Sequence, residues 1–356
     1  MSEPASDATR PRGRRRRAVV VAVALVFSPL VAEIVARATG VRGLVLHDQA
    51  GRRYAAGKPP LPHRLLPGGS TTVVYRRRDG TAVRSATMTV NAAGFRGPLP
   101  ADGDPRIVCI GDSHTFGFGV DDGEPWPRRL EDALHALGVE QAEVLNLGVG
   151  GYESPHELVR LRDDAFVHAP DIIVWQWFVN DLQMPAAARP RTGWAARLKR
   201  WTSPWNGGAA ALRRHSVVAD HVLQAVHASL DHGADQIRAA ADSLETTDGW
   251  AEACSSIRAG RDAAHTHGAE FVVVVFPLLV RNGDSFLSRP IDLQLLAFCE
   301  REGIPAIDLA PALPHRESAT LRNSAIDYHP SPRCHALAGR AIAAELIETL
   351  GERRGR

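Results

Sequence analysis

The sequence has few cysteines, and those it has show no motif. Its 356 residues include 4 Cys, none in the CxxC spacing of a zinc or redox site. We therefore expect no metal, no cofactor and no dependence of folding on disulfides. Cys109 lies in an apolar run and is predicted to be a small buried side chain. In an oxidising compartment, two of Cys254, Cys299 and Cys334 can pair, but the sequence does not choose the pair.

Net charge is also small, except at the beginning of the chain. There are 42 Lys plus Arg against 40 Asp plus Glu, and residues 1–17 hold six Arg but only two acids. That leaves 36 basic and 38 acidic residues in the rest of the chain. A nearly neutral body argues against nucleic-acid binding, which needs a basic surface to compete for phosphates. The length suits one large domain with additions, or two domains.

The basic arm of residues 1–17 precedes the only long uncharged apolar run, Ala18 to Ala32. Arginines before such a run hold that end in the cytoplasm and send the chain beyond the run across the membrane. Residues 18–38 are therefore predicted to be a signal anchor, or a signal peptide cut after Ala36-Arg37-Ala38. A buried core helix behind a basic tail is the third interpretation. The first two place the body outside the cytoplasm, either anchored in the inner membrane or secreted.

The rest of the chain reads as a parallel α/β domain with additions. Residues 39–97 contain a hairpin signal, Thr71 to Tyr75 and Ala86 to Val90 around Asp79-Gly80, and are predicted to form a β-rich preface. From residue 106 onward, short apolar runs alternate with helical stretches, which is typical of a sheet covered by helices on both faces. Residues 183–249 are Ala-rich with scattered Trp and are predicted to be a helical insertion. The predicted strands are 106–110, 143–147, 171–178, 270–276 and 304–309, and the predicted helices are 126–137, 155–166, 250–267 and 332–350.

The first of these strands runs directly into Gly111-Asp112-Ser113. In open α/β sheets, reactive groups gather beyond the carboxyl ends of the strands. A serine at a helix start is also a common N-cap. From this motif alone, Ser113 is either a nucleophile or a cap.

Four dispersed blocks resemble those of the GDSL or SGNH hydrolases, a superfamily of esterases and acyl transferases. The resemblance covers roughly residues 98–350 and implies a three-layer α/β/α, flavodoxin-like fold with a serine nucleophile. The blocks are GDSHTFGFGV (111–120), NLGVGGY (146–152), FVND (178–181) and DYHP (327–330).

The resemblance also implies roles for single residues. It aligns Ser113 with the nucleophile, Gly151 and Asn180 with the oxyanion hole, and Asp327 and His329 with the C-terminal acid and base. The spacing Asp327-x-His329 departs from the common Asp-x-x-His and is closer to the periplasmic polysaccharide O-acetyltransferase branch. Two further stretches, 90–97 and 248–250, resemble the membrane-anchored bacterial branch. His114 and Phe178 stand where the family usually has Leu and Gly.

These residue types suit acyl transfer. A serine hydroxyl needs a base, and the imidazole of His329 can take its proton and later return it. Asp327 would hold the ring in the right tautomer. The backbone N–H groups of Ser113 and Gly151 and the amide of Asn180 would stabilise the oxyanion. Asp308, at the end of a predicted strand, is the alternative partner of His329.

Several residues have simpler structural interpretations. Asn146 and Gly148 are predicted to build a tight turn, and Asn180 is alternatively a cap. His335, in the last helix, is predicted to be a packing or surface residue rather than a second base. Trp126, Trp175 and Trp177 belong either to the core or to a substrate cleft.

Three functions are open for the whole protein. The first is an esterase that removes short acyl groups, above all acetyl, from an envelope glycan or another exposed ester. The second is an O-acyltransferase acting on an extracellular polysaccharide. The third is an inactive glycan-binding or scaffold protein. The sequence does not give the oligomeric state.

Overall fold

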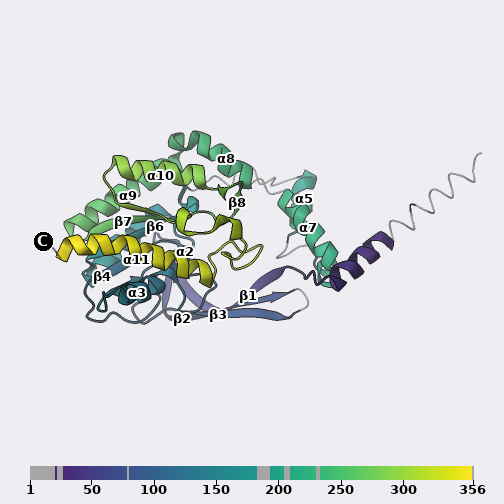
Figure 1. Cartoon of the computed structure of the whole chain (residues 1–356), viewed down its shortest axis with the longest axis horizontal. Coiled ribbons are helices and arrows are strands. Elements are labelled where there is room, and N and C mark those ends of the chain that lie inside the picture. Colours follow the sequence, from purple (N-terminus) through teal and green to yellow (C-terminus); the bar gives the residue numbers. More distant parts are fainter. Residues whose placement is uncertain are drawn as a thin grey trace, which may run out of the picture. The chain divides into compact units, whose positions relative to one another are not determined.

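The computed structural model describes residues 21, 27–77, 80–182, 193–203, 209–229 and 233–354 (Figure 1). The predicted basic arm, residues 18–20 and 22–26 of the predicted anchor, and Asp79 of the predicted hairpin turn lie outside these residues. The chain divides into two compact units. Unit 1 comprises Met1–Leu44, Arg77–Thr81 and Thr192–Leu230, and unit 2 comprises Val45–Arg76, Ala82–Arg191 and Asp231–Arg356.

Unit 2 is built on a five-stranded sheet in the order β10-β7-β6-β4-β5. All four strand pairs are parallel, and the predicted parallel α/β fold is confirmed. The chain runs from β4 out to β5 and then returns to the other side of β4 for β6, so its direction of winding reverses beside β4. The strands are β4 (Arg106–Ile110), β5 (Glu143–Asn146), β6 (Ile172–Trp177), β7 (Glu270–Val275) and β10 (Ala306–Asp308).

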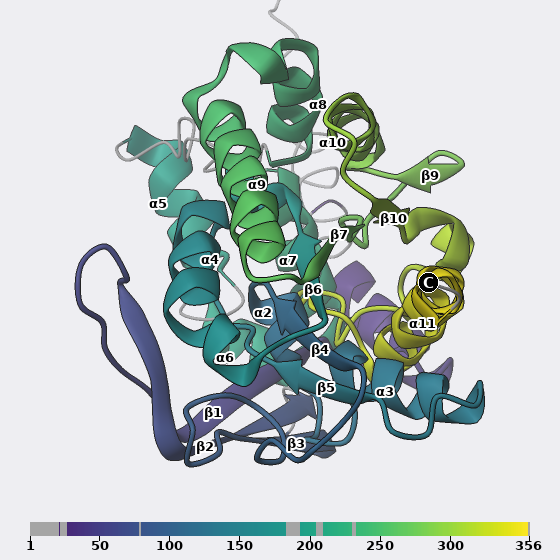
Figure 2. The ribbon, with the colours of Figure 1, turned by 90° about the vertical axis from the view of Figure 1, so that its left-hand side faces the viewer.

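Helices cover both faces of this sheet (Figure 2). On one face α3 (Trp126–Ala136) packs beside α11 (Pro332–Arg354), and on the other α4 (Ser154–Arg160) packs beside α9 (Asp248–Thr266). Successive side chains of a strand point to opposite faces of the sheet, so each strand contributes to two hydrophobic cores, one on each face. Besides short 3-10 helices, one of which (Val179–Leu182) follows β6, unit 2 contains α2 (Ser113–Phe116), a π-helical turn (Leu161–Ala165), α8 (Gly233–Ser243), α10 (Arg289–Arg301), β8 (Arg281–Asn282) and β9 (Ser285–Phe286).

The two cores settle the interpretation of several side chains. Trp126, Trp175 and Trp177 are fully buried, so they belong to the core rather than to a cleft. Cys109 is buried as predicted. All four cysteines are free, and the disulfide considered among the other three is absent.

The preface forms a separate antiparallel sheet in the order β1-β2-β3. Its strands are β1 (Val45–Ala56), β2 (His63–Arg77) and β3 (Ala82–Thr89). The predicted hairpin is present, with Thr71 opposite Met88 and Tyr75 opposite Arg84. Thr71, Val73 and Tyr75 alternate inward, and this face packs on Phe116 and Phe118 of the body. The preface is therefore part of the same compact unit as the parallel sheet.

Unit 1 combines the end of the predicted anchor with much of the predicted insertion. It contains a helix at residues 27–38, α5 (Gly193–Trp201), α6 (Ala210–His215) and α7 (Val217–Ser229). Glu33 accepts hydrogen bonds at 3.0 Å from the backbone N–H groups of Val217 and Val218 at the start of α7. Within the described ranges, no helix has both the length and the apolar character to cross a membrane.

Candidate active site

The candidate nucleophile lies where β4 ends. The chain leaves the sheet at Gly111, and α2 begins at Ser113. The N-cap is Asp112, whose carboxylate accepts a hydrogen bond from the His114 N–H at 2.8 Å. The alternative interpretation of Ser113 as the cap is therefore wrong. Its hydroxyl stays available and is partly exposed.

The structure brings this hydroxyl together with the predicted base and acid. His329 Nε2 lies 3.0 Å from Ser113 Oγ, and His329 Nδ1 lies 2.6 Å from Asp327 Oδ1. Serine and histidine are 216 residues apart in sequence. The alternative acid, Asp308, instead pairs with Arg289 at 2.7 Å. The chain of contacts from Asp327 through His329 to Ser113 is the arrangement in which imidazole can move a proton to and from a hydroxyl.

Asn180 lies beside the nucleophile segment and comes from the end of the neighbouring strand. It lies after β6, which pairs directly with β4. Its Nδ2 donates to Asp112 Oδ2 at 2.7 Å. This bond uses one of the two amide hydrogens, fixes the plane of the amide, and leaves the second hydrogen for a substrate oxygen. Burial alone would raise the pKa of Asp112, but His114 and Asn180 more than offset it, and the pKa lies below its ordinary value.

The third predicted oxyanion residue lies in the turn after β5. Gly151 has a φ of +80°, a conformation that glycine adopts without strain. Its neighbour Gly150 lies against the nucleophile, because a Cβ built on it would be 3.5 Å from Ser113 Cβ and 2.6 Å from Tyr54 Oη. His63 Nε2 lies 2.8 Å from the Gly150 carbonyl oxygen and holds this turn in place. Ser113, Gly151 and Asn180 thus lie beyond the ends of three strands, β4, β5 and β6, and the turn that carries Gly151 contacts Ser113 through Gly150.

Comparison with protein-family models gives the same assignment. Residues 109–337, more than half of the chain, match the GDSL-like lipase/acylhydrolase family. The chain belongs to this family. It is therefore a serine hydrolase that acts on ester bonds. No curated protein matches the chain as a relative.

Solved structures of GDSL-family proteins are similar to this one at low identity. A catalytic variant of Axe2, an acetylxylan esterase from Geobacillus stearothermophilus, is 14% identical with a TM-score of 0.42, over 69% of this chain and 96% of its own. A member of the lipolytic G-D-S-L family from Veillonella parvula is 16% identical with a TM-score of 0.40, over 68% of this chain and 98% of its own.

Three further residues are structural: Asn146 and Gly148 of the second block, and His335 of α11. Asn146 donates to the Thr115 carbonyl at 2.8 Å and accepts from the Gly148 N–H at 3.1 Å, so this pair builds the predicted turn. His335 is fully buried, and its Nδ1 accepts from the Trp126 N–H at 3.1 Å. It packs within the last helix as predicted.

Four residues near the site were not predicted from sequence, and all come from the preface. Tyr75 donates to Asp327, His47 Nδ1 lies 3.6 Å from the same carboxylate, and His63 and Tyr54 lie over the Gly150 turn. Tyr75 lies in a predicted strand, but its inward alternation is shared with core residues such as Val73. His47, Tyr54 and His63 lie outside the predicted strands.

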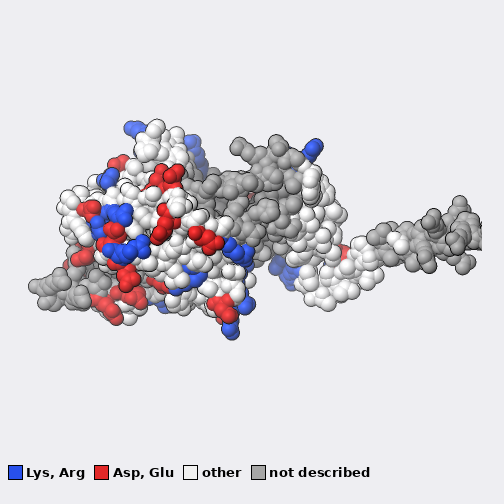
Figure 3. Space-filling view, turned by 90° about the horizontal axis from the view of Figure 1, so that it is seen from above, with Lys and Arg blue, Asp and Glu red and all other residues white. Residues whose placement is uncertain are grey.

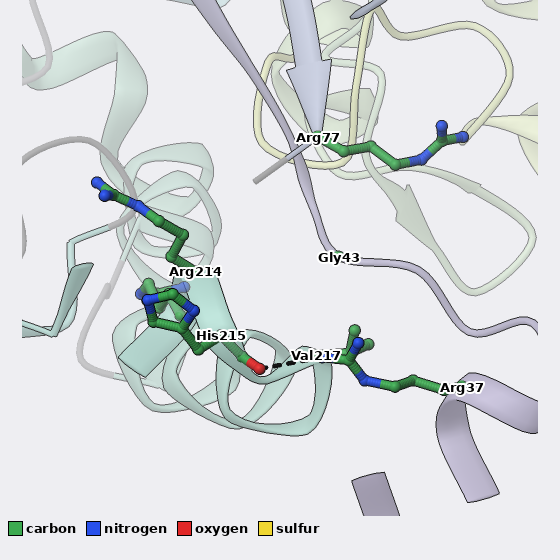
Figure 4. Close-up of a pocket in the computed structure, with 7 residues that line it drawn as sticks. Arg37, Gly43, Arg77, Arg214, His215 and Val217 are labelled. Carbon is green, nitrogen blue, oxygen red and sulfur yellow. Dashed lines mark hydrogen bonds between the residues drawn. The ribbon is translucent and has the colours of Figure 1, made fainter. Parts of the chain in front are cut away.

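A second feature of interest is a pocket of about 230 Å³ within unit 1, whose lining includes none of the catalytic residues (Figure 4). Four arginines contribute to this lining: Arg37, Arg77, Arg213 and Arg214. Arg213 is buried and paired with Asp220 at 2.9 Å, and Arg37 is paired with Glu33 at 2.6 Å. Figure 4 shows the side chains of Arg77 and Arg214 pointing away from each other. The arrangement does not converge on one ligand group.

Proposed function

We propose that the protein hydrolyses short acyl esters, above all acetyl esters, on an envelope glycan or another extracytoplasmic molecule, through an acyl-enzyme at Ser113. The observation that carries this proposal is the alignment of Asp327, His329 and Ser113 at 2.6 Å and 3.0 Å. Serine and histidine come from distant parts of the sequence, and Asp327 and Ser113 are linked through the imidazole. A merely structural network has no need to end on a partly exposed hydroxyl.

The first half of the reaction forms the acyl-enzyme. Ser113 Oγ attacks the carbonyl carbon of the ester while His329 Nε2 takes the hydroxyl proton. The carbonyl oxygen becomes an oxyanion, which accepts hydrogen bonds from the N–H groups of Ser113 and Gly151 and from the Asn180 amide. As the intermediate collapses, the bond to the alcohol oxygen breaks, and His329 gives its proton to the leaving alcohol.

The second half releases the acid. Water loses a proton to His329 and attacks the acyl carbon, and the new oxyanion is stabilised by the same donors. Collapse breaks the bond to Ser113 Oγ, which regains its proton from His329. Asp327 stays ionised and holds Nδ1–H throughout. Burial alone would raise the pKa of Asp327, but His329 and Tyr75 more than offset it, and the pKa lies below its ordinary value.

The surroundings of Ser113 support a polar substrate such as a sugar ester. The rings of Tyr54 and His63 lie near the Gly150 turn with their centroids 4.5 Å apart and their planes tilted by 58°, and the Phe118 ring lies 4.6 Å from that of His329. Aromatic rings offer flat apolar faces next to polar edges, which suits the mixed surface of a sugar ring. On one face of the molecule, Lys and Arg are interspersed with Asp and Glu (Figure 3). This fits the prediction that the partner is not a nucleic acid.

A membrane location is part of the proposal. Unit 1 holds most of the large apolar side chains that are exposed among the described residues, including Phe27, Leu30, Val31 and Ile34 of the helix at 27–38. This helix continues the uncharged run that begins at Ala18, behind the arginines of residues 1–17. We propose that the N-terminus lies inside and the catalytic unit outside. A reporter enzyme active only outside the cytoplasm, fused after Arg356, tests this orientation: activity supports it, and inactivity of a stable fusion contradicts it.

The chemical proposal is tested with the full chain in detergent on short-chain chromogenic esters. We expect hydrolysis by the wild type, and loss with retained fold for Ser113→Ala and His329→Ala. Undiminished hydrolysis by both variants contradicts the mechanism. If Ser113→Ala also leaves the biological role intact, the inactive binding protein is the better account.

An O-acyltransferase is the second candidate, favoured by the short Asp327-x-His329 spacing. It shares the acyl-enzyme, with a sugar hydroxyl in place of water. Incubation with an acetyl donor and candidate glycans separates the two. Free acetate without acetylated sugar supports hydrolysis, and acetylated sugar supports transfer.

A further inference from the structure

The far oxygen of the catalytic acid is held by a tyrosine of the preface. Tyr75 Oη donates to Asp327 Oδ2 at 2.8 Å, while Asp327 Oδ1 faces His329 Nδ1 at 2.6 Å. Oδ1 also accepts from the His329 N–H at 3.2 Å. Tyrosine and aspartate are 252 residues apart in sequence and both are buried. Each carboxylate oxygen therefore has its own donor.

The surroundings of Tyr75 keep its hydroxyl in the donor role. Burial, and after it the charge of Asp327, raises the pKa of Tyr75 far above its ordinary value, so the hydroxyl remains protonated. The guanidinium of Arg84, opposite Tyr75 in the sheet, lies 4.5 Å from the ring centroid. An ionised carboxylate can only accept, so this hydrogen bond has one direction.

The Tyr75 hydroxyl lies where a side chain at residue 119 would begin, so Gly119 leaves room for it. A Cβ built on Gly119 would lie 2.1 Å from Tyr75 Oη and 2.7 Å from Asn323 Nδ2. Gly119 belongs to the same block as the nucleophile, GDSHTFGFGV at 111–120. The segment that carries the nucleophile therefore packs closely against Tyr75 of β2, next to the hydrogen bond from Tyr75 to Asp327.

We propose that Tyr75 is a positioning residue for catalysis, which holds the Asp327 carboxylate so that its other oxygen faces His329. The inference rests on the proposed function, because it assigns a role in the Asp327–His329–Ser113 relay. It makes the preface a required part of the active site rather than a spacer between membrane and enzyme. Without the hydroxyl, the buried carboxylate can rotate about its Cβ–Cγ bond, and the imidazole loses a fixed partner.

The groups that face Asp327 from the elements packed around it are His329, Tyr75 and His47. His47 Nδ1 lies 3.6 Å from Oδ2, on the same side as Tyr75. Arg84 approaches through the tyrosine ring. The pH dependence of the site thus reflects these groups together, and removing one hydroxyl is the smallest change that isolates Tyr75.

The test compares Tyr75→Phe with wild type in the full chain. The phenyl ring keeps the packing and removes only the hydrogen bond. A hydrogen bond to a charged group corresponds to about a 10- to 100-fold effect, so we expect kcat to fall by that factor with KM little changed. We also expect the acid limb of the profile of kcat/KM against pH to move to higher pH, because the carboxylate has lost a donor to its charged form.

A matched control separates positioning from packing. Val73→Ala truncates a fully buried apolar side chain on the same face of β2, two residues away, and removes no hydrogen bond. It should lower the melting temperature while leaving the acid limb in place. In an Asp327→Asn background, Tyr75→Phe should have little further effect on kcat, since the carboxylate through which it acts is gone.

The outcomes distinguish this inference from the proposed function. If Ser113→Ala abolishes hydrolysis but Tyr75→Phe stays within about twofold of wild type with an unmoved acid limb, the positioning role is wrong and the mechanism stands. An equal loss from Tyr75→Phe in the wild-type and Asp327→Asn backgrounds also overturns the inference. If Ser113→Ala retains hydrolysis, the proposed function itself fails.

Discussion

Replacing Gly119 by alanine tests the fit between the nucleophile loop and the preface. Gly119 has a φ of +78°, where an alanine costs about 1–2 kcal/mol in backbone strain. The added Cβ would also lie 2.1 Å from Tyr75 Oη, whereas ordinary contacts begin near 3.4 Å. The hydroxyl must therefore move by about 1 Å, and overpacking of this kind costs roughly a further 1–3 kcal/mol.

The expected result combines lost stability with lost catalysis. Gly119→Ala should lower the free energy of unfolding by about 2–5 kcal/mol in total. Because the shift exceeds the tolerance of the 2.8 Å bond from Tyr75 to Asp327, kcat should fall as it does for Tyr75→Phe. Thermal or denaturant unfolding and ester hydrolysis on the same preparations measure both effects.

A double mutant shows whether the hydroxyl is the obstacle. In the Tyr75→Phe background the atom at 2.1 Å is gone, while Asn323 Nδ2 at 2.7 Å and the ring carbon Cζ at 3.2 Å remain. Gly119→Ala should therefore cost less than in the wild type, and it should not lower kcat further. Equal costs of Gly119→Ala in the two backgrounds would refute the reasoning, because the clash would then not involve the tyrosine hydroxyl.

Two other residues give independent predictions. Asn180→Ala should lower kcat by about 10²–10³, the usual loss of one oxyanion donor, with a smaller change in KM; steady-state kinetics check this, and an unchanged kcat removes Asn180 from the site. Asp292 is buried in α10, and burial raises its pKa from 3.8 to about 7. It binds more protons in the folded state, so it lowers stability as pH rises from about 4 to about 7. Asp292→Asn should flatten this fall, by up to about 4 kcal/mol relative to wild type. Denaturant unfolding at several pH values measures it, and parallel curves for the two proteins contradict it.

Much of the fold could be predicted because its signals are local. The run at 106–110 has four consecutive apolar residues after Arg106 and is bounded by turn residues, and it is β4. The hairpin was predictable in the same way from alternation around a turn, and its register places Thr71 opposite Met88. Helix ends were less accurate, since the stretch predicted as a helix at 155–166 becomes a π-helical turn from Leu161.

Site residues could be predicted from the sequence only where they lie in the GDSL blocks and have side chains or backbone groups suited to acyl transfer. Ser113 and His329 meet as predicted, but nothing in the sequence shows that Asp112 rather than Ser113 caps α2. Tyr75 could not be found, because its inward position is shared with Val73 and depends on a contact 252 residues away. The hydrogen bonds from the N–H groups of Val217 and Val218 to Glu33 could not be predicted either, because they arise only once distant helices pack.

The most direct test of the central claim is covalent labelling of the serine. A fluorophosphonate reacts with a serine only where the hydroxyl is activated and the oxyanion is stabilised, and it needs no knowledge of the natural substrate. Mass spectrometry of the labelled full chain should place one adduct on Ser113. Labelling should vanish in Ser113→Ala and slow by orders of magnitude in His329→Ala. An adduct on another residue, or labelling at the wild-type rate in His329→Ala, would contradict the account.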